Sequence, residues 1–186
     1  MTVSAEGPVE LIIAEYESLR GEILKLIELQ SQLVSLAVVA LGTILSFGLQ
    51  ARNSVLVFVY PFLSLMLGIS WLNHSHAISR CAAYLSLELE SRCGHSVLGW
   101  ENYVRRNPLR FGMLGYWGVR SVFMGSSVTA FVAGIILLRG TAVEMIAATT
   151  SCLVTASTIL LFVVWREPSP RKLLKDERAR TAQAEG

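Results

Sequence analysis

The sequence predicts an all-α protein that crosses a membrane four times, and three observations support this fold class. Of the 186 residues, 53% are hydrophobic and only 16% are charged, whereas a soluble domain is usually about one-quarter charged. Mean hydropathy is +0.52. Four uncharged stretches approach the length of about 20 helical residues that crosses a bilayer, while the alternating segments of a transmembrane β-barrel do not occur.

The four predicted transmembrane helices are these uncharged stretches, which we expect to form two hairpins. They cover residues 29–51, 54–73, 121–138 and 145–165. Within each pair the connection is only a few residues long, which predicts a tight turn. The connection between the two pairs, residues 74–120, is much longer and carries most of the polar residues outside the termini.

The basic residues indicate the orientation in the membrane. An even number of crossings places residues 1–28, the 74–120 connection and the 166–186 tail on one side. These segments contain 14 of the 16 Lys and Arg residues, and only Arg52 and Arg139 lie on the other side. Because Lys and Arg in short loops stay cytoplasmic, we expect a multi-pass protein of the inner (plasma) membrane with both termini in the cytoplasm. The acidic N-terminal segment lacks the features of a cleavable signal peptide.

The first two transmembrane helices are predicted to extend into the cytoplasm. Apolar side chains recur at heptad spacing through residues 1–28, with charged residues on the other faces, and similar spacing continues after the second span as far as Gly94. We therefore expect a cytoplasmic amphipathic helix and an antiparallel, coiled-coil stalk through which the protein associates. The residues expected at its contact face are Tyr16, Leu19, Ile23, Leu26, Ile78, Leu85 and Leu89.

An alternative for these amphipathic segments is that they lie flat on the bilayer surface. The acidic face of the N-terminal helix disfavours this, because helices on membrane surfaces usually carry Lys and Arg on their polar face.

Residues 99–120 mix aromatic and basic side chains, which suits the headgroup layer of a membrane. The same mixture occurs in proteins that bind single-stranded nucleic acid. Since the segment adjoins a span and the net charge is only +2, we expect contact with anionic lipid headgroups and no nucleic-acid partner. The predicted interface residues are Trp100, Tyr103, Arg105, Arg106, Arg110, Tyr116 and Trp117.

The sequence contains no recognisable catalytic or metal-binding motif. His74, His76, Cys81, Cys93 and His95 lie near one another, but their spacing matches no known metal site. Residues two apart on a helix, such as His74 and His76, face nearly opposite directions. The four spans also lack the ionisable residues that ion-coupled transporters need. We expect no enzyme activity, no metal and no cofactor.

The third and fourth spans are rich in hydroxyl side chains. These are Ser126, Ser127, Thr129, Thr149, Thr150, Ser151, Thr155, Ser157 and Thr158. Small residues at four-residue spacing allow close helix packing in a membrane, which is the simpler interpretation. The alternative is a conduit lined by these hydroxyls that forms when copies of the chain assemble.

The runs YPFLSLMLGISW at 60–71, ELE at 88–90 and GWENY at 99–103 resemble a group of uncharacterised bacterial four-pass integral membrane proteins. The resemblance implies no known activity. The predicted function is therefore non-enzymatic: a homo-oligomeric scaffold or signalling component that associates through its cytoplasmic stalk, with a cytoplasmic partner that the sequence does not identify. The alternative is a small oligomeric channel or membrane-permeabilising effector lined by the hydroxyls of the third and fourth spans.

Overall fold

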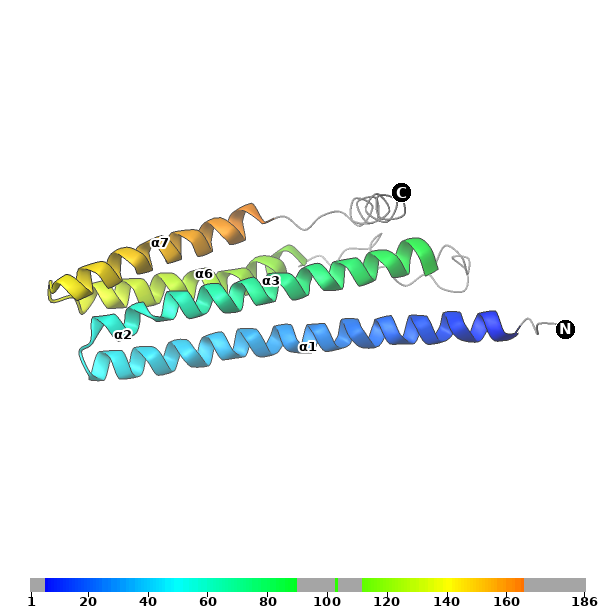
Figure 1. Ribbon diagram of the computed structural model, residues 1–186, viewed down its shortest axis with the longest axis horizontal. Coiled ribbons are helices and arrows are strands. Elements are labelled where there is room, and N and C mark those ends of the chain that lie inside the picture. The colour runs from blue at the N-terminus through cyan, green and yellow to red at the C-terminus, as the bar shows by residue number, and fades with distance from the viewer. Residues whose placement is uncertain (1–5, 90–102, 104–111, 166–186) are drawn as a thin grey trace, which may run out of the picture. The chain divides into compact units, whose positions relative to one another are not determined.

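The computed structural model describes residues 6–89, 103 and 112–165, and all regular structure in these ranges is helical (Figure 1). The elements are α1 (Glu6–Gln50), α2 (Ser54–Phe58), α3 (Tyr60–Tyr84), the π-helical turn η1 (Leu85–Leu89), α6 (Gly112–Ile136) and α7 (Ala142–Val164). The predicted all-α class is thus confirmed for the part of the chain that is described.

Four helical stretches in these ranges are long and apolar enough to cross a membrane. They are Glu10–Gln50, Ser54–Leu89, Trp117–Ile136 and Ala142–Val164. Their length and hydropathy are those of a multi-pass membrane protein, as the uncharged stretches of the sequence predict. Each stretch contains one of the predicted spans or most of it.

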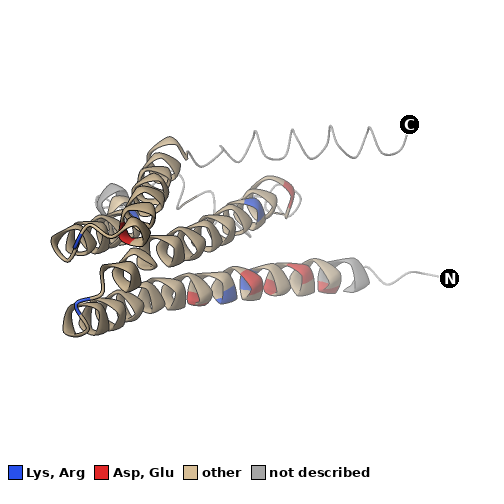
Figure 2. Ribbon diagram, turned by 60° about the vertical axis from the view of Figure 1, so that its left-hand side comes forward, with Lys and Arg blue, Asp and Glu red and all other residues tan. Residues whose placement is uncertain are grey.

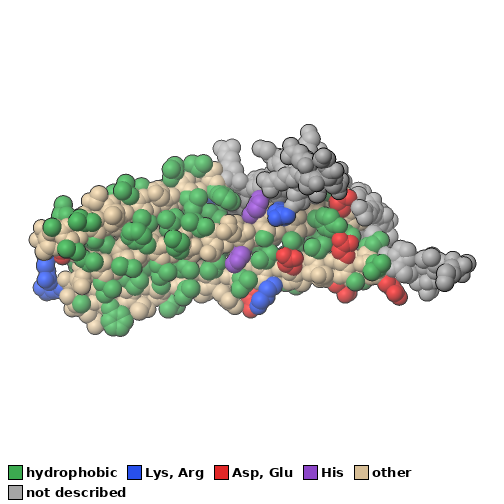
Figure 3. All heavy atoms as spheres, in the orientation of Figure 1, with side chains coloured by type: hydrophobic (Ala, Val, Ile, Leu, Met, Phe, Trp, Pro, Cys, Tyr) green, Lys and Arg blue, Asp and Glu red, His purple; other side chains and the backbone are tan. Residues whose placement is uncertain are grey.

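The chain divides into two compact units. We call the first the polar unit; its described helical residues are 6–29 and 74–89. The second, the apolar unit, contains the described residues 30–73 and 112–165. Acidic residues gather in the N-terminal half of α1, within the polar unit (Figure 2). Apolar side chains are spread over the visible surface of the apolar unit (Figure 3).

In the polar unit, α1 packs against α3 and η1 along an apolar seam. Ile23, Leu85 and Leu89 are buried at its centre. Half-buried side chains surround them: Ile12, Tyr16, Leu19, Ile78, Cys81 and Tyr84. At the edge of the seam, Tyr84 Oη donates a hydrogen bond of 2.8 Å to Glu15 Oε1. The heptad spacing of the apolar residues places them on one side of α1, so they meet α3 together.

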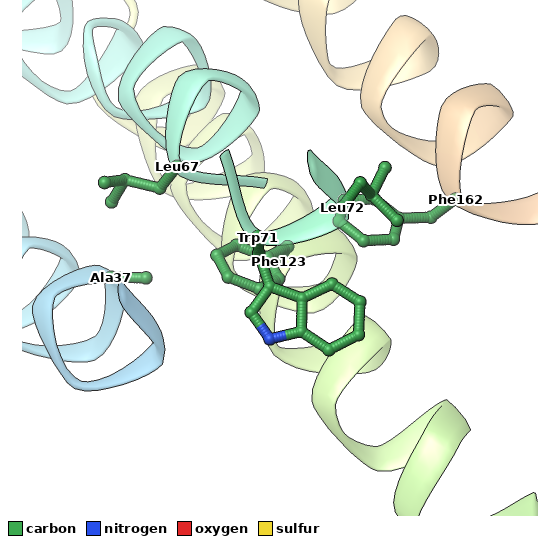
Figure 4. Close-up of a cluster of buried hydrophobic side chains, with 6 residues drawn as sticks. All are labelled: Ala37, Leu67, Trp71, Leu72, Phe123 and Phe162. Carbon is green, nitrogen blue, oxygen red and sulfur yellow. The ribbon is translucent and has the colours of Figure 1, made fainter. Parts of the chain in front are cut away.

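One core cluster of the apolar unit contains side chains from α1, α3, α6 and α7. It consists of Ala37, Leu67, Trp71, Leu72, Phe123 and Phe162 (Figure 4). The rings of Phe123 and Phe162 stack with their centroids 5.5 Å apart, and Trp71 is tilted against both. Because lipid is as apolar as these side chains, it is close packing rather than exclusion of water that holds such helices together.

The second apolar stretch is broken at Val59, between α2 and α3. Pro61 has no N–H and cannot donate to the carbonyl four residues earlier. The Val59 N–H instead bonds to the Leu56 carbonyl at 3.3 Å, closing a tighter turn. The break thus lies just before Pro61, the residue that interrupts the hydrogen-bond ladder.

The third apolar helix extends beyond the predicted span. That span starts at residue 121, immediately after Arg120, whereas α6 begins at Gly112. Arg120 therefore lies within a helix and not at the end of an interfacial loop. A helix can extend beyond the bilayer, so its start at Gly112 does not test where the span begins. Arg120 has hydrogen-bond partners on α7, described below.

We predict that Gly134→Ala destabilises the apolar unit by about 1–3 kcal/mol, the usual cost of overpacking. A Cβ at Gly134 would lie 2.5 Å from the Phe58 ring, whereas one at Gly125, on the same helix, would meet nothing within 4 Å. Gly125→Ala is therefore the matched control and should be neutral or stabilising, since Ala favours helix by about 1 kcal/mol. Thermal unfolding in nanodiscs measures both, and equal effects would contradict the packing of Phe58 on Gly134.

Candidate functional site

A shallow groove of about 270 Å³ lies beside the seam of the polar unit. It is lined by Leu19, Glu22, Ala77, Arg80, Cys81 and Tyr84. Burial raises the pKa of the Cys81 thiol, and the nearby Glu22 carboxylate raises this pKa further. The thiol is therefore protonated at neutral pH, and a protonated thiol is a poor nucleophile.

The predicted stalk residues lie in the seam itself. Ile23, Leu85 and Leu89 are buried, and Tyr16, Leu19 and Ile78 pack against them. Leu26 is half-buried one turn beyond Ile23 on α1. Six of the seven predicted residues thus belong to one cluster within a single chain.

The outer side of the same stretch of α1 carries uncovered apolar residues. Ile13, Leu24 and Ile27 are 51%, 67% and 48% exposed. At 100° per residue, Leu24 lies only about 20° round the helix from Ile13, and Ile27 about 60° from Leu24. The three residues therefore lie on one side of α1, with Leu24 and Ile27 adjacent and Ile13 separated from Leu24 by Glu17 and Arg20. We call this line the apolar ridge.

Most of the predicted membrane-interface residues lie outside the described part of the chain. This applies to Trp100, Arg105, Arg106 and Arg110. Tyr103 and Trp117 are described, and both side chains are exposed. Tyr116 lies in α6.

Of the residues weighed as metal ligands, Cys93 and His95 lie outside the described ranges. Within those ranges, no group of three His, Cys, Asp or Glu side chains could hold a metal ion.

Arg120 is the largest fully buried side chain in the described residues, with 1% exposure. Its Nη1 donates hydrogen bonds to the carbonyl oxygens of Phe162, at 2.7 Å, and Trp165, at 3.0 Å. These carbonyls belong to the C-terminal end of α7, which has no further helical turn to supply donors. The guanidinium thus caps α7 and places a positive charge at the negative end of its dipole.

Glu144 has the corresponding role at the other end of α7. Thr141 and Glu144 form a reciprocal capping box in which each side chain accepts a hydrogen bond from the other residue's backbone N–H. Glu144 Oε2 also accepts from the Arg139 N–H at 3.1 Å, and Oε1 accepts from Ser54 Oγ at 2.8 Å. The carboxylate thereby joins the first turn of α7 to the first residue of α2.

The hydroxyl side chains of α6 and α7 fall into two groups. Those on the outside donate to their own helix. Ser121 bonds to the carbonyl three residues earlier, and the others bond to the carbonyl four residues earlier: Thr129, Thr149, Thr150 and Ser157. Those inside are Ser126, Ser127, Ser151, Thr155 and Thr158. Among the inner group, Ser126 and Thr158 also donate to their own helices.

No family model, curated protein or solved structure matches the chain. The class of protein is therefore defined by its own features. Four apolar helices of membrane-spanning length make it a multi-pass helical membrane protein.

Neither the contacts of Arg120 nor those of Glu144 at the ends of α7 were predicted from the sequence. The pattern Thr141-x-x-Glu144 is readable as a capping box before an apolar run. The partners of Arg120 and Ser54 lie 42 and 90 residues away in sequence, and no local pattern marks them.

We predict that Arg120→Ala destabilises the apolar unit by about 3 kcal/mol, because hydrogen bonds to a charged donor are each worth about 1.5–3 kcal/mol. Arg120→Lys should lose less, since the ammonium keeps the charge and can reach one carbonyl. The control is Arg139→Ala, at an exposed side chain, which should change stability by less than about 0.5 kcal/mol. Unfolding in nanodiscs measures all three variants; a harmless Arg120→Ala would contradict the capping role.

A double-mutant cycle tests the link between α2 and α7. We expect Ser54→Ala to cost about 1 kcal/mol and Glu144→Ala about 1–3 kcal/mol. Once Glu144 is replaced, the further change at Ser54 should cost little, because its acceptor has gone. Unfolding free energies of the two single variants and the double variant measure the coupling. Strictly additive effects would show that the 2.8 Å hydrogen bond contributes nothing.

Proposed function

We propose that this protein is a non-enzymatic scaffold or signalling component of the inner (plasma) membrane. In this proposal the apolar unit forms two helical hairpins in the bilayer, and the polar unit extends into the cytoplasm as a helical stalk. The orientation rests on the distribution of basic residues, of which only Arg52 and Arg139 lie on the opposite side. The exposed Trp117 and Tyr103 side chains suit a position near anionic lipid headgroups.

The observation that carries the proposal is the apolar ridge of Ile13, Leu24 and Ile27. The seam residues of α1 already pack against α3 and η1 of the same chain. In the proposed stalk they are therefore not the surface that a partner contacts. The ridge remains uncovered although the helix around it is charged. Outside a membrane, apolar side chains gathered on one line of a helix favour contact with another protein surface.

The partner contact is therefore proposed on the ridge, about a quarter-turn round α1 from the seam. Glu17 and Arg20 lie between Ile13 and Leu24 on the same side of the helix. Polar residues within a contact line restrict which partner and which register fit it. Either a second copy of the chain or a cytoplasmic protein fits this surface.

The second candidate function is a small oligomeric channel or membrane-permeabilising effector. It is favoured by the outward hydroxyls Thr149, Thr150 and Ser157 on α7. Each is satisfied by its own helix, so it can face either lipid or a neighbouring copy. Ser126 and Thr155 point into the unit and are less suited to line a conduit between chains.

We predict that a photo-crosslinking amino acid at Leu24 captures another polypeptide in intact cells. The same amino acid at Val39, which is similarly exposed but lies in the apolar unit, is the matched control and should give little protein adduct because lipid surrounds it. The products are measured by mass after purification.

Leu24→Glu should abolish the adducts formed from Ile27 while leaving the protein folded, since both side chains are exposed. Absence of adducts at Leu24 and Ile27 would contradict the scaffold proposal. Ion flux from liposomes containing the purified protein, lost on replacing Thr150 and Ser157 by Leu, would instead favour the channel.

A further inference from the structure

Three hydroxyl groups in the apolar unit are fully buried and have no hydrogen-bond partner among the described residues. They are Ser127 Oγ, Ser151 Oγ and Thr155 Oγ1. The exposed fractions of these residues are 0%, 0% and 6%. A buried hydroxyl without a partner is unfavourable, so the arrangement needs an explanation.

By helical position, the three hydroxyls lie on the inward faces of α6 and α7, which contact each other and also α2 and α3. Ser127 follows Arg120 by seven residues, or two helical turns, and therefore shares the side of α6 from which Arg120 reaches α7. On α7, Thr155 and Ser151 precede Phe162 by seven and eleven residues. Both lie on the side from which the Phe162 ring stacks on Phe123 of α6.

The hydroxyls also lie at about the same height along the two helices. A short connection after Ile136 reverses the chain direction before α7 begins at Ala142. Starting from the contact of Arg120 with Phe162, seven residues along each helix lead to Ser127 on α6 and to Thr155 on α7. Each path is about 10.5 Å long at 1.5 Å per residue. Ser151 is one turn further on.

The surroundings of the hydroxyls are small and uncharged. Ala130 follows Ser127 by one turn on α6, Ala148 precedes Ser151 by one turn on α7, and both are buried. Residues 121–138 of α6 and the following turn, and residues 145–165 of α7 and its C-cap, include no Asp, Glu, Lys or Arg. Hydroxyl groups both donate and accept, so the chemistry favours a neutral molecule that does the same.

From this arrangement we infer that Ser127, Ser151 and Thr155 bind ordered water between α6 and α7. A buried water typically makes two to four hydrogen bonds to otherwise unpaired polar groups, which matches the three hydroxyls. A neighbouring hydroxyl is satisfied without water, because Thr158 donates to the Val154 carbonyl of its own helix at 2.9 Å. The site is internal to one chain and is independent of the proposed function of the ridge.

Water-edited solid-state NMR of the full chain in phospholipid bilayers tests the inference. Magnetisation should pass rapidly from water to the side chains of Ser127, Ser151 and Thr155. Thr158 is the matched control, because it is equally buried on the same side of α7 but is bonded to its own helix. We expect transfer at the three residues and little at Thr158.

Thr155→Val preserves the shape of the side chain and removes only the hydroxyl, so it should reduce the water transfer at Ser127 and Ser151. Thr158→Val should leave that transfer unchanged. If transfer at the three residues is no faster than at Thr158, or if Thr155→Val does not affect the other two, the water site does not exist. Should Thr155→Val fail to fold, Ser151→Ala provides the same comparison at Ser127 and Thr155.

Discussion

Both ends of α7 are held by a charged side chain of the sign that its helix dipole favours. Glu144 accepts backbone N–H groups at the start of the helix, and Arg120 donates to carbonyls at its end. A helix in a bilayer can satisfy its interior backbone groups by itself, but its ends cannot. The other contacts of α7 depend on these two caps, because they fix where the helix begins and ends.

The two capping side chains also align α7 with its neighbouring helices. Ser54 ties the start of α2 to Glu144, and Arg120 fixes the height of α6 against α7. With the ends fixed, the aromatic rings of Trp71, Phe123 and Phe162 meet at one level. Packing this close requires small neighbours, and at Gly68 an added Cβ would lie 2.8 Å from the Phe162 ring.

The sequence was sufficient to predict what depends on local composition and spacing. Apolar runs predicted the four membrane-length helices, and the heptad pattern predicted residues that cluster with Ile23 and Leu85. The role of Arg120 could not be predicted, because a charge beside an apolar run ordinarily marks its boundary. Only its distant carbonyl partners make a buried position favourable, and pairing across 42 or more residues leaves no local pattern.

The meaning of an exposed apolar side chain depends on which unit carries it. Leu153 on α7 and Leu24 on α1 are 65% and 67% exposed. In the apolar unit such exposure is favourable, since lipid solvates Leu as well as protein does. On the charged part of α1, in the orientation proposed above, the same exposure faces water and is unfavourable until another surface covers it. In that orientation, lipid solvates the exposed apolar side chains of the apolar unit, whereas those of the ridge favour contact with another apolar surface.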